Sequence, residues 1–170
     1  MVHGVDINAS YVKDFADKYP YIPVAVMNAG LDHFPFDAVY DLIFHRDVIY
    51  YLSNEEIAFH FKNAYDHLSP GGHLVFQFIE KDLTIARDEN GRDSYKLNLQ
   101  ELHGANSDLI FRGETNPIRK LDIDWLIGLA AKTGFKLKAT KTVIESYSPN
   151  ESVYRVDRYL LLEKYSASSN

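Results

Sequence analysis

An almost unbroken apolar run at residues 74–79 constrains the fold more than any other feature of this sequence. A predicted helix precedes the run, begins with a capping box of Ser53 and Glu56, and carries an apolar side made of Ile57, Phe61, Ala64 and Leu68. The Ser, Pro and Gly residues at 69–72 separate the helix from the run. Because its side chains are apolar on both faces, the run is typical of a central strand covered by helices on both sides.

The same order of elements precedes this unit. A buried-strand candidate at 40–45 comes before the helix, and a short strand ending near Ile7 opens the chain. Asn8 or Ser10 is expected to cap a helix that ends at residues 19–20. A short apolar run at 22–27 then predicts another strand. Alternating strands and helices predict an α/β fold with a mostly parallel sheet.

The second half of the sequence predicts an insertion, a helix and a hairpin. Residues 81–121 lose clear periodicity and are expected to form a substrate-covering insertion. Asp122 then begins a helix that ends at Gly134. Strand candidates at 135–145 and 154–164 form a C-terminal antiparallel hairpin. We interpret residues 1–170 as a single domain.

Composition excludes several classes of function. The formal net charge is -6, and Lys and Arg are scattered, which argues against a nucleic-acid partner. No apolar stretch approaches the roughly 20 residues that cross a bilayer, and a secretory signal is absent, so no membrane association and a cytoplasmic location are expected. The chain has no cysteine. His60 and His67 lie seven apart without a compact ligand cluster, so no metal site is expected.

Polar residues follow the predicted strands, where ligands of open α/β sheets bind. Asp6 can accept hydrogen bonds from the two hydroxyls of a ribose, or it can simply help to cap the following helix. Asn28 and Asp32 follow the next strand and can bond the amine of an adenine, with Ala29 or Leu31 against its face. Ordinary turn formation explains both residues equally well.

Among the residues at the end of the third strand candidate, His45 is best suited to proton transfer near neutral pH. A structural histidine is the alternative. Arg46 and Asp47 either line the cleft or form a surface ion pair. Tyr50 and Tyr51 either face the substrate or anchor the packing before the helix.

Five short motifs in this order resemble the class I S-adenosylmethionine-dependent methyltransferases. They are Gly4-Val5-Asp6-Ile7, Phe34-Pro35-Phe36, Tyr40-Asp41-Leu42-Ile43-Phe44, Leu68-Ser69-Pro70-Gly71-Gly72 and Gly134-Phe135. The segment at 42–51 is also similar to chemotaxis receptor glutamate methyltransferases. The resemblance implies a Rossmann-like fold and S-adenosylmethionine as cofactor.

Carried over residue by residue, the resemblance makes Asp6 the ribose ligand, with Ile7 beside it, and assigns the adenine to Asn28, Ala29 or Asp32. His45 would begin the cleft loop beneath the sulfonium, as a catalytic residue together with Tyr50. The acceptor would meet Arg46 and two residues of the insertion, Tyr95 and His103. The loop at 28–36 is about two residues longer than is usual in the family.

The chain departs from the family at its N-terminal end, where the first strand and its glycine-rich loop have no counterpart. In the family's strand order, 3-2-1-4-5-7-6, that strand lies between those containing Val5 and Ile43. We therefore expect an apparently truncated sheet whose two strands either pair directly or receive a strand from another molecule. Weak cofactor binding and an oligomeric or aggregation-prone chain would follow.

The leading functional hypothesis is methyl transfer to a small molecule, in which alignment of the reactants supplies most of the acceleration. A noncatalytic, partner-binding methyltransferase-like subunit is the first alternative. A protein carboxylate methyltransferase is the second. The sequence also leaves open whether the chain is active alone.

Overall fold

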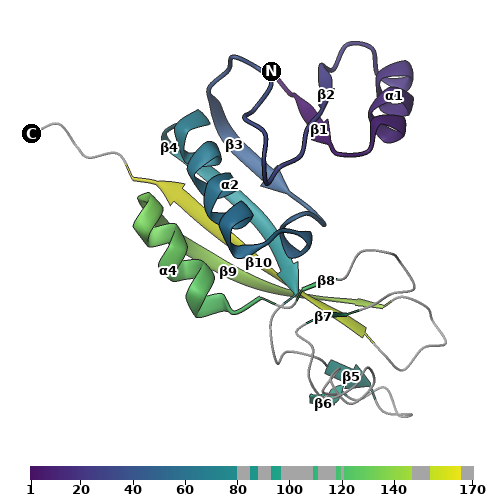
Figure 1. Ribbon diagram of the computed structural model, residues 1–170. Helices are drawn as coiled ribbons and strands as arrows, with labels where there is room; N and C mark the ends of the chain where they lie inside the picture. Colours follow the sequence, from purple (N-terminus) through teal and green to yellow (C-terminus); the bar gives the residue numbers. More distant parts are fainter. Residues whose placement is uncertain are drawn as a thin grey trace, which may run out of the picture.

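The computed structural model describes residues 1–79, 85–87, 93–96, 109–110, 118–119, 121–146 and 154–165. Its N-terminal part is a β-α-β unit (Figure 1) of strand β1 (Gly4–Asp6), helix α1 (Ala9–Lys18) and strand β2 (Val24–Val26). β1 and β2 pair in parallel, with Asp6 opposite Val26. Asn8 caps α1, since its side chain accepts from the amides of Ser10 and Tyr11.

The larger sheet has four strands in the order β3-β4-β10-β9. Their bounds are Tyr40–His45 for β3, Leu68–Ile79 for β4, Tyr154–Lys164 for β10 and Phe135–Ser146 for β9. β3 and β4 are parallel, whereas β10 is antiparallel to both β4 and β9. The α/β fold and the C-terminal antiparallel hairpin are confirmed.

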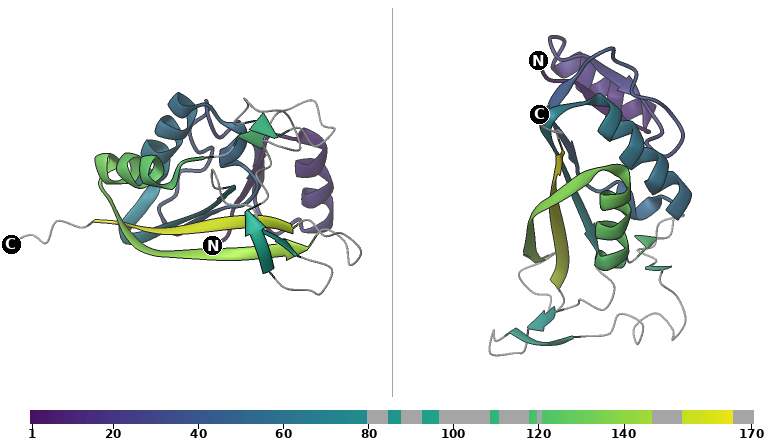
Figure 2. Two further views of the ribbon diagram at one scale, coloured as in Figure 1. Left: turned by 90° about the horizontal axis from the view of Figure 1, so that it is seen from below. Right: turned by 90° about the vertical axis from the view of Figure 1, so that its left-hand side faces the viewer.

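Two helices, α2 (Asn54–His67) and α4 (Ile123–Thr133), cover this sheet. Both lie on the same face of it (Figure 2). The run at 74–79 predicted helices on both faces, so for the described helices that prediction is wrong. The run is apolar on the helix face because Leu74, Phe76 and Phe78 enter the core there. On the other face the side chains of the run are less apolar, and they include the buried Gln77.

Local signals set the ends of both helices. The predicted capping box is present in α2, where Ser53 Oγ accepts from the Glu56 amide and the Glu56 carboxylate accepts from the Ser53 amide. Asp122 caps α4, and Gly134 ends it with φ of 105°. A Cβ at Gly134 would lie 3.0 Å from the ring of Tyr65, so both conformation and space favour glycine.

The core lies between the two helices and the sheet. Phe61 of α2, Phe76 of β4 and Leu126 of α4 are each at most 1% exposed, as is Leu160 of β10. Lys164, the last residue of β10, donates to the carbonyl oxygens of Tyr65 and Leu68 at 2.7 and 2.8 Å. A cation at a helix C-terminus is favourable there, so this lysine ties β10 to the end of α2.

β1 and β3 belong to separate sheets, so they do not pair directly. β3 is an edge strand of its sheet, and Leu42 and Phe44 on it are each 56% exposed. Val5 on β1 is 41% exposed. The first of the two arrangements expected for these strands is therefore wrong, and acceptance of a strand from another molecule stays a prediction.

The expected insertion at 81–121 lies largely outside the described residues. The described pieces are two short pairs, β5 (Ile85–Arg87) with β6 (Asp93–Lys96), and β7 (Leu109–Ile110) with β8 (Ile118–Arg119). His103 is outside the described residues, and only the backbone of Tyr95 is described, in β6.

Candidate functional site

The first candidate residues lie where β1 and β2 end. Asp6 closes β1, and its backbone carbonyl accepts from the amide of Met27, so the loop that follows β2 begins beside it. Its side-chain Oδ1 accepts from the Asn8 amide at 2.7 Å. The carboxylate is exposed and makes this one side-chain hydrogen bond among the described residues. A ribose diol needs such an acceptor, so Asp6 stays a candidate ribose ligand, and its bond to the amide of the N-cap residue Asn8 fits the capping interpretation.

The loop after β2 is a compact turn. Asn28 Oδ1 accepts from the Gly30 amide at 3.0 Å, and the Asn28 amide donates to Asp32 Oδ2 at 2.8 Å. These bonds are the turn chemistry that was one of the two interpretations of Asn28 and Asp32. The exposed Asp32 and the partly buried Ala29 stay candidates for contact with an adenine.

Helix α2 holds this loop from the side. Glu56, His60 and Asn63 are spaced at i, i+4 and i+7, which places them on one helix face. A Cβ at Gly30 would lie 2.7 Å from Glu56 Cβ, so this backbone passes close against the helix. Asn63 Nδ2 donates to Asp32 O at 3.0 Å, and His60 Nδ1 donates to Ala29 O at 2.9 Å.

His45, the last residue of β3, reaches the same helix face. Both of its ring nitrogens lie 3.1 Å from His60 Nε2, and the two rings are 4.3 Å apart at 65°. Burial lowers the pKa of His45 well below 6.5, and the neighbouring His60 lowers it further. Burial also lowers the pKa of His60 to about 4, against the smaller raising effect of the Ala29 carbonyl. Both imidazoles are therefore neutral at pH 7.

Tyr50 does not face solvent. It lies in the short 3-10 helix η1 (Ile49–Tyr51), is 2% exposed, and donates through its hydroxyl to the Asp47 carboxylate. Asp47 has φ of 57°, a left-handed conformation that aspartate tolerates better than most side chains. The Arg46 guanidinium lies 3.4 Å from the same carboxylate on the surface, as the ion-pair interpretation of Arg46 and Asp47 predicted.

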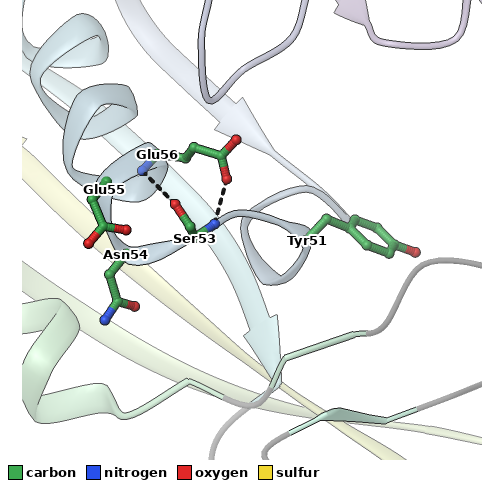
Figure 3. A pocket seen from close by; sticks show the side chains of 5 residues that line it. All are labelled: Tyr51, Ser53, Asn54, Glu55 and Glu56. Atoms are coloured by element: carbon green, nitrogen blue, oxygen red, sulfur yellow. Dashed lines mark hydrogen bonds between the residues drawn. The ribbon is translucent and has the colours of Figure 1, made fainter.

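A shallow pocket borders this region at the start of α2 (Figure 3). Its lining consists of Tyr51, Ser53, Asn54, Glu55 and Glu56. Ser53 and Glu56 are bonded to each other as the capping box, which Figure 3 shows as dashed lines. Because the helix end already uses these polar groups, the pocket is a weaker ligand site than the loop on the other side of Glu56.

Sequence reasoning missed His60, which it considered only as a metal ligand with His67. The available signal was its position, because His60 lies within the apolar stripe of Ile57, Phe61 and Ala64. A polar residue in such a stripe needs a partner.

Among the described residues, no group of three or more His, Asp or Glu side chains could hold a metal ion. No helix in this part of the chain is long and apolar enough to cross a membrane.

Comparison with known proteins concerns the family and the fold of the chain. Residues 1–76 match the family model described as a methyltransferase domain, and this range contains every candidate residue from Asp6 to Tyr50. No curated protein sequence matches the chain.

Several solved structures that resemble the chain are methyltransferases. One from Mesorhizobium loti is 16% identical, with a TM-score of 0.65 over 95% of this chain and 80% of that one. The N-methyltransferase NodS from Bradyrhizobium japonicum, in complex with S-adenosylhomocysteine, is 15% identical, with a TM-score of 0.58 over 96% and 66%. The 1,6-didemethyltoxoflavin-N1-methyltransferase from Burkholderia thailandensis is 10% identical, with a TM-score of 0.61 over 97% and 61%.

Proposed function

Because the fold resembles that of S-adenosylmethionine-dependent methyltransferases and residues 1–76 match the methyltransferase-domain model, we propose that the chain is a class I S-adenosylmethionine-dependent methyltransferase and that its methyl acceptor is a small molecule. The observation that carries the proposal is that the loop at 28–32 and the end of β3 meet on one face of α2, where Ala29 O and His45 both contact His60. Asp6 lies beside the start of that loop, since its carbonyl accepts from the Met27 amide.

Each residue has a role that its surroundings support. Asp6 and the adjacent Ile7 would hold the ribose, and Asn28, Ala29 and Asp32 would hold the adenine. S-adenosylmethionine, when bound, supplies an electrophilic methyl carbon. His45 would take the proton that an N–H or O–H acceptor must lose, since its neutral ring is a proton acceptor at pH 7. Tyr50 would position Asp47 and the loop after β3 rather than contact the acceptor.

One of the similar structures supports a small acceptor, since the Burkholderia enzyme binds 1,6-didemethyltoxoflavin. In our proposal the acceptor meets Arg46 from the loop after β3, and Tyr95 and His103 from the segment at 81–121. A protein carboxylate as acceptor, which the resemblance of residues 42–51 to receptor methyltransferases suggested, is the alternative substrate class.

Asp6→Ala is expected to weaken binding of S-adenosylhomocysteine by about 1–3 kcal/mol, the range for loss of hydrogen bonds to a charged group. NMR titration of this chain measures the affinity even when binding is weak. The amide signals of Asp6, Ala29 and His45 are expected to shift most. Asp14→Ala, which removes an exposed acid from α1, is the matched control. Equal affinities for the two variants would remove Asp6 from the site.

The exposed strands support a second candidate, a subunit that binds a partner by accepting a strand. β1 and β3 lie in separate sheets, and their apolar residues Val5, Leu42 and Phe44 are exposed. Unpaired strand edges with apolar side chains are ready templates for pairing with another chain. Such a subunit would bind its partner whether or not it transferred a methyl group.

The chain on its own is therefore expected to self-associate as its concentration rises. Sedimentation velocity should show oligomers that the double substitution Leu42→Lys, Phe44→Lys reduces, because charges on an edge strand oppose pairing. Val39→Lys changes another exposed apolar residue just before β3 and should have little effect. A wild-type chain that stays monomeric at all concentrations would rule out strand acceptance between copies.

A further inference from the structure

His60 occupies an unusual place on α2. It is 3% exposed and lies within the apolar stripe of the helix, yet both of its ring nitrogens have polar neighbours. The ring of Phe34 lies 6.2 Å away on one side, and the ring of His45 lies 4.3 Å away. Water has little access to such a ring, so its hydrogen bonds must come from the protein.

The neighbours decide where the protons are. Ala29 O is a carbonyl oxygen and only accepts, so His60 Nδ1 carries the hydrogen of the 2.9 Å bond. A neutral imidazole has one N–H, which leaves His60 Nε2 as an acceptor. The groups 3.1 Å from it are the ring nitrogens of His45, so one of these donates. The other nitrogen of His45 then keeps its lone pair.

The result is one directed chain of hydrogen bonds, from His45 to His60 and from His60 to the loop after β2. His60 differs here from its neighbours on the same helix face. Asn63 contacts the loop through Asp32 O, and His67 bonds Asn63 O at 2.9 Å. Of the three residues, His60 is the one that the structure bonds to both the loop and His45.

We propose that His60 is a positioning residue, which holds the His45 ring as a hydrogen-bond donor toward α2 and ties that orientation to the Ala29 carbonyl. The part that concerns methyl transfer rests on the proposed function, because it makes His45 the proton acceptor. His60 touches neither cofactor nor acceptor in this arrangement. It acts through His45 on one side and through Ala29 on the other.

Nitrogen-15 NMR of the unliganded chain tests the hydrogen bonds directly. An N–H···N bond gives a scalar coupling between the two ring nitrogens, which is expected between His45 and His60. His60→Phe keeps a ring of similar size and removes both bonds. The His45 ring N–H should then exchange with water about tenfold faster or more, since tenfold corresponds to about 1.4 kcal/mol. His67→Phe is the matched control and should retain the coupling.

Two conservative variants separate the two bonds. In His60→Asn the amide N–H takes the place of Nδ1, so slow amide exchange around Ala29 should return while the His45 N–H stays exposed to exchange. In His60→Gln the longer side chain brings its carbonyl oxygen near the position of Nε2, so the opposite pattern is expected. If His60 had a role in packing alone, these two variants would not show opposite exchange patterns at Ala29 and His45.

The result that overturns the proposal is a folded wild type without the coupling, or a His60→Phe variant whose His45 N–H exchanges at the wild-type rate. If His60→Phe does not fold, the proposal is tested by the nitrogen–nitrogen coupling in the wild type and by the exchange patterns of His60→Asn and His60→Gln. S-adenosylhomocysteine should then shift the His45 ring signals of the wild type more than those of His60→Gln. If S-adenosylhomocysteine does not bind, the result counts against the proposed function alone. If it binds but the His45 ring signals do not shift, the proposed connection from the loop at 28–32 through His60 to His45 is wrong.

Discussion

Lowering the pH from 6.5 to about 4 is expected to reduce the free energy of unfolding by about 3 kcal/mol through His60 alone. The pKa of His60 is lowered from 6.5 to about 4 in the folded chain because the ring is buried. As the pH falls through 6.5, the unfolded chain binds a proton that the folded chain does not, so stability declines. Below about 4 the folded chain binds it too, and this decline ends. The lowered pKa of His45 acts in the same direction.

Urea unfolding at several pH values between 7 and 4 measures this loss. His60→Phe cannot titrate at this position, so its stability should depend less on pH, whereas His67→Phe should keep the wild-type dependence. Other charged or titratable groups on the elements around the ring are present in both the wild type and His60→Phe, so they affect the pH dependence of the two proteins alike. These groups are Asp32, His33, Asp47, Glu56 and His67. An equal decline in wild type and His60→Phe would show that the buried pair is not the cause.

Replacement of His45 by alanine is expected to reduce turnover about 100-fold or more with little change in cofactor affinity, because a general base acts in the chemical step. Because the pKa of His45 lies well below 6.5, the wild-type rate should not fall as the pH drops to 6.5. Tyramine, which carries an amine and a phenol, is a suitable first acceptor. Mass spectrometry of the product identifies the atom that receives the methyl group.

Arg46→Ala, at the neighbouring exposed position, is the matched control for this experiment. In the proposal Arg46 contacts the acceptor and not the transferred proton, so its loss should raise the KM and leave the turnover less affected. A His45→Ala variant with a near-normal rate across the pH range would leave His45 as a lining residue and the proton transfer without a base.

Elements with local signals could be predicted from the sequence. The capping box of Ser53 and Glu56, the stop at Gly134 and the hairpin of β9 and β10 all depend on residues close together in the chain. The start of β4 could not. Turn-forming residues at 69–72 indicated a strand from 74, but pairing of Tyr40 with Leu68 extends the ladder backward.

The candidate site was less predictable, because it depends on contacts between distant segments. The order of strands predicted that Asp6, the loop at 28–32 and His45 would meet at one edge. That His60 would join them depends on how α2 packs against the loop, over a separation of 31 residues to Ala29. The burial of Tyr50 was one of its two interpretations, and the choice between them depends on the turn of η1, which no residue pattern indicated.

The position of β10 has a consequence for how the chain folds during synthesis. β10 lies between β4 and β9 and is bonded through Lys164 to the end of α2, although it follows all of them in sequence. A ribosome adds about 5–20 residues per second, so the residues between Ile79 and Tyr154 take several seconds to appear. During that time the edge of β4 that β10 will cover is bare. Contacts of such long range form slowly, so this edge of β4 is open to pairing with other chains until β10 has been made.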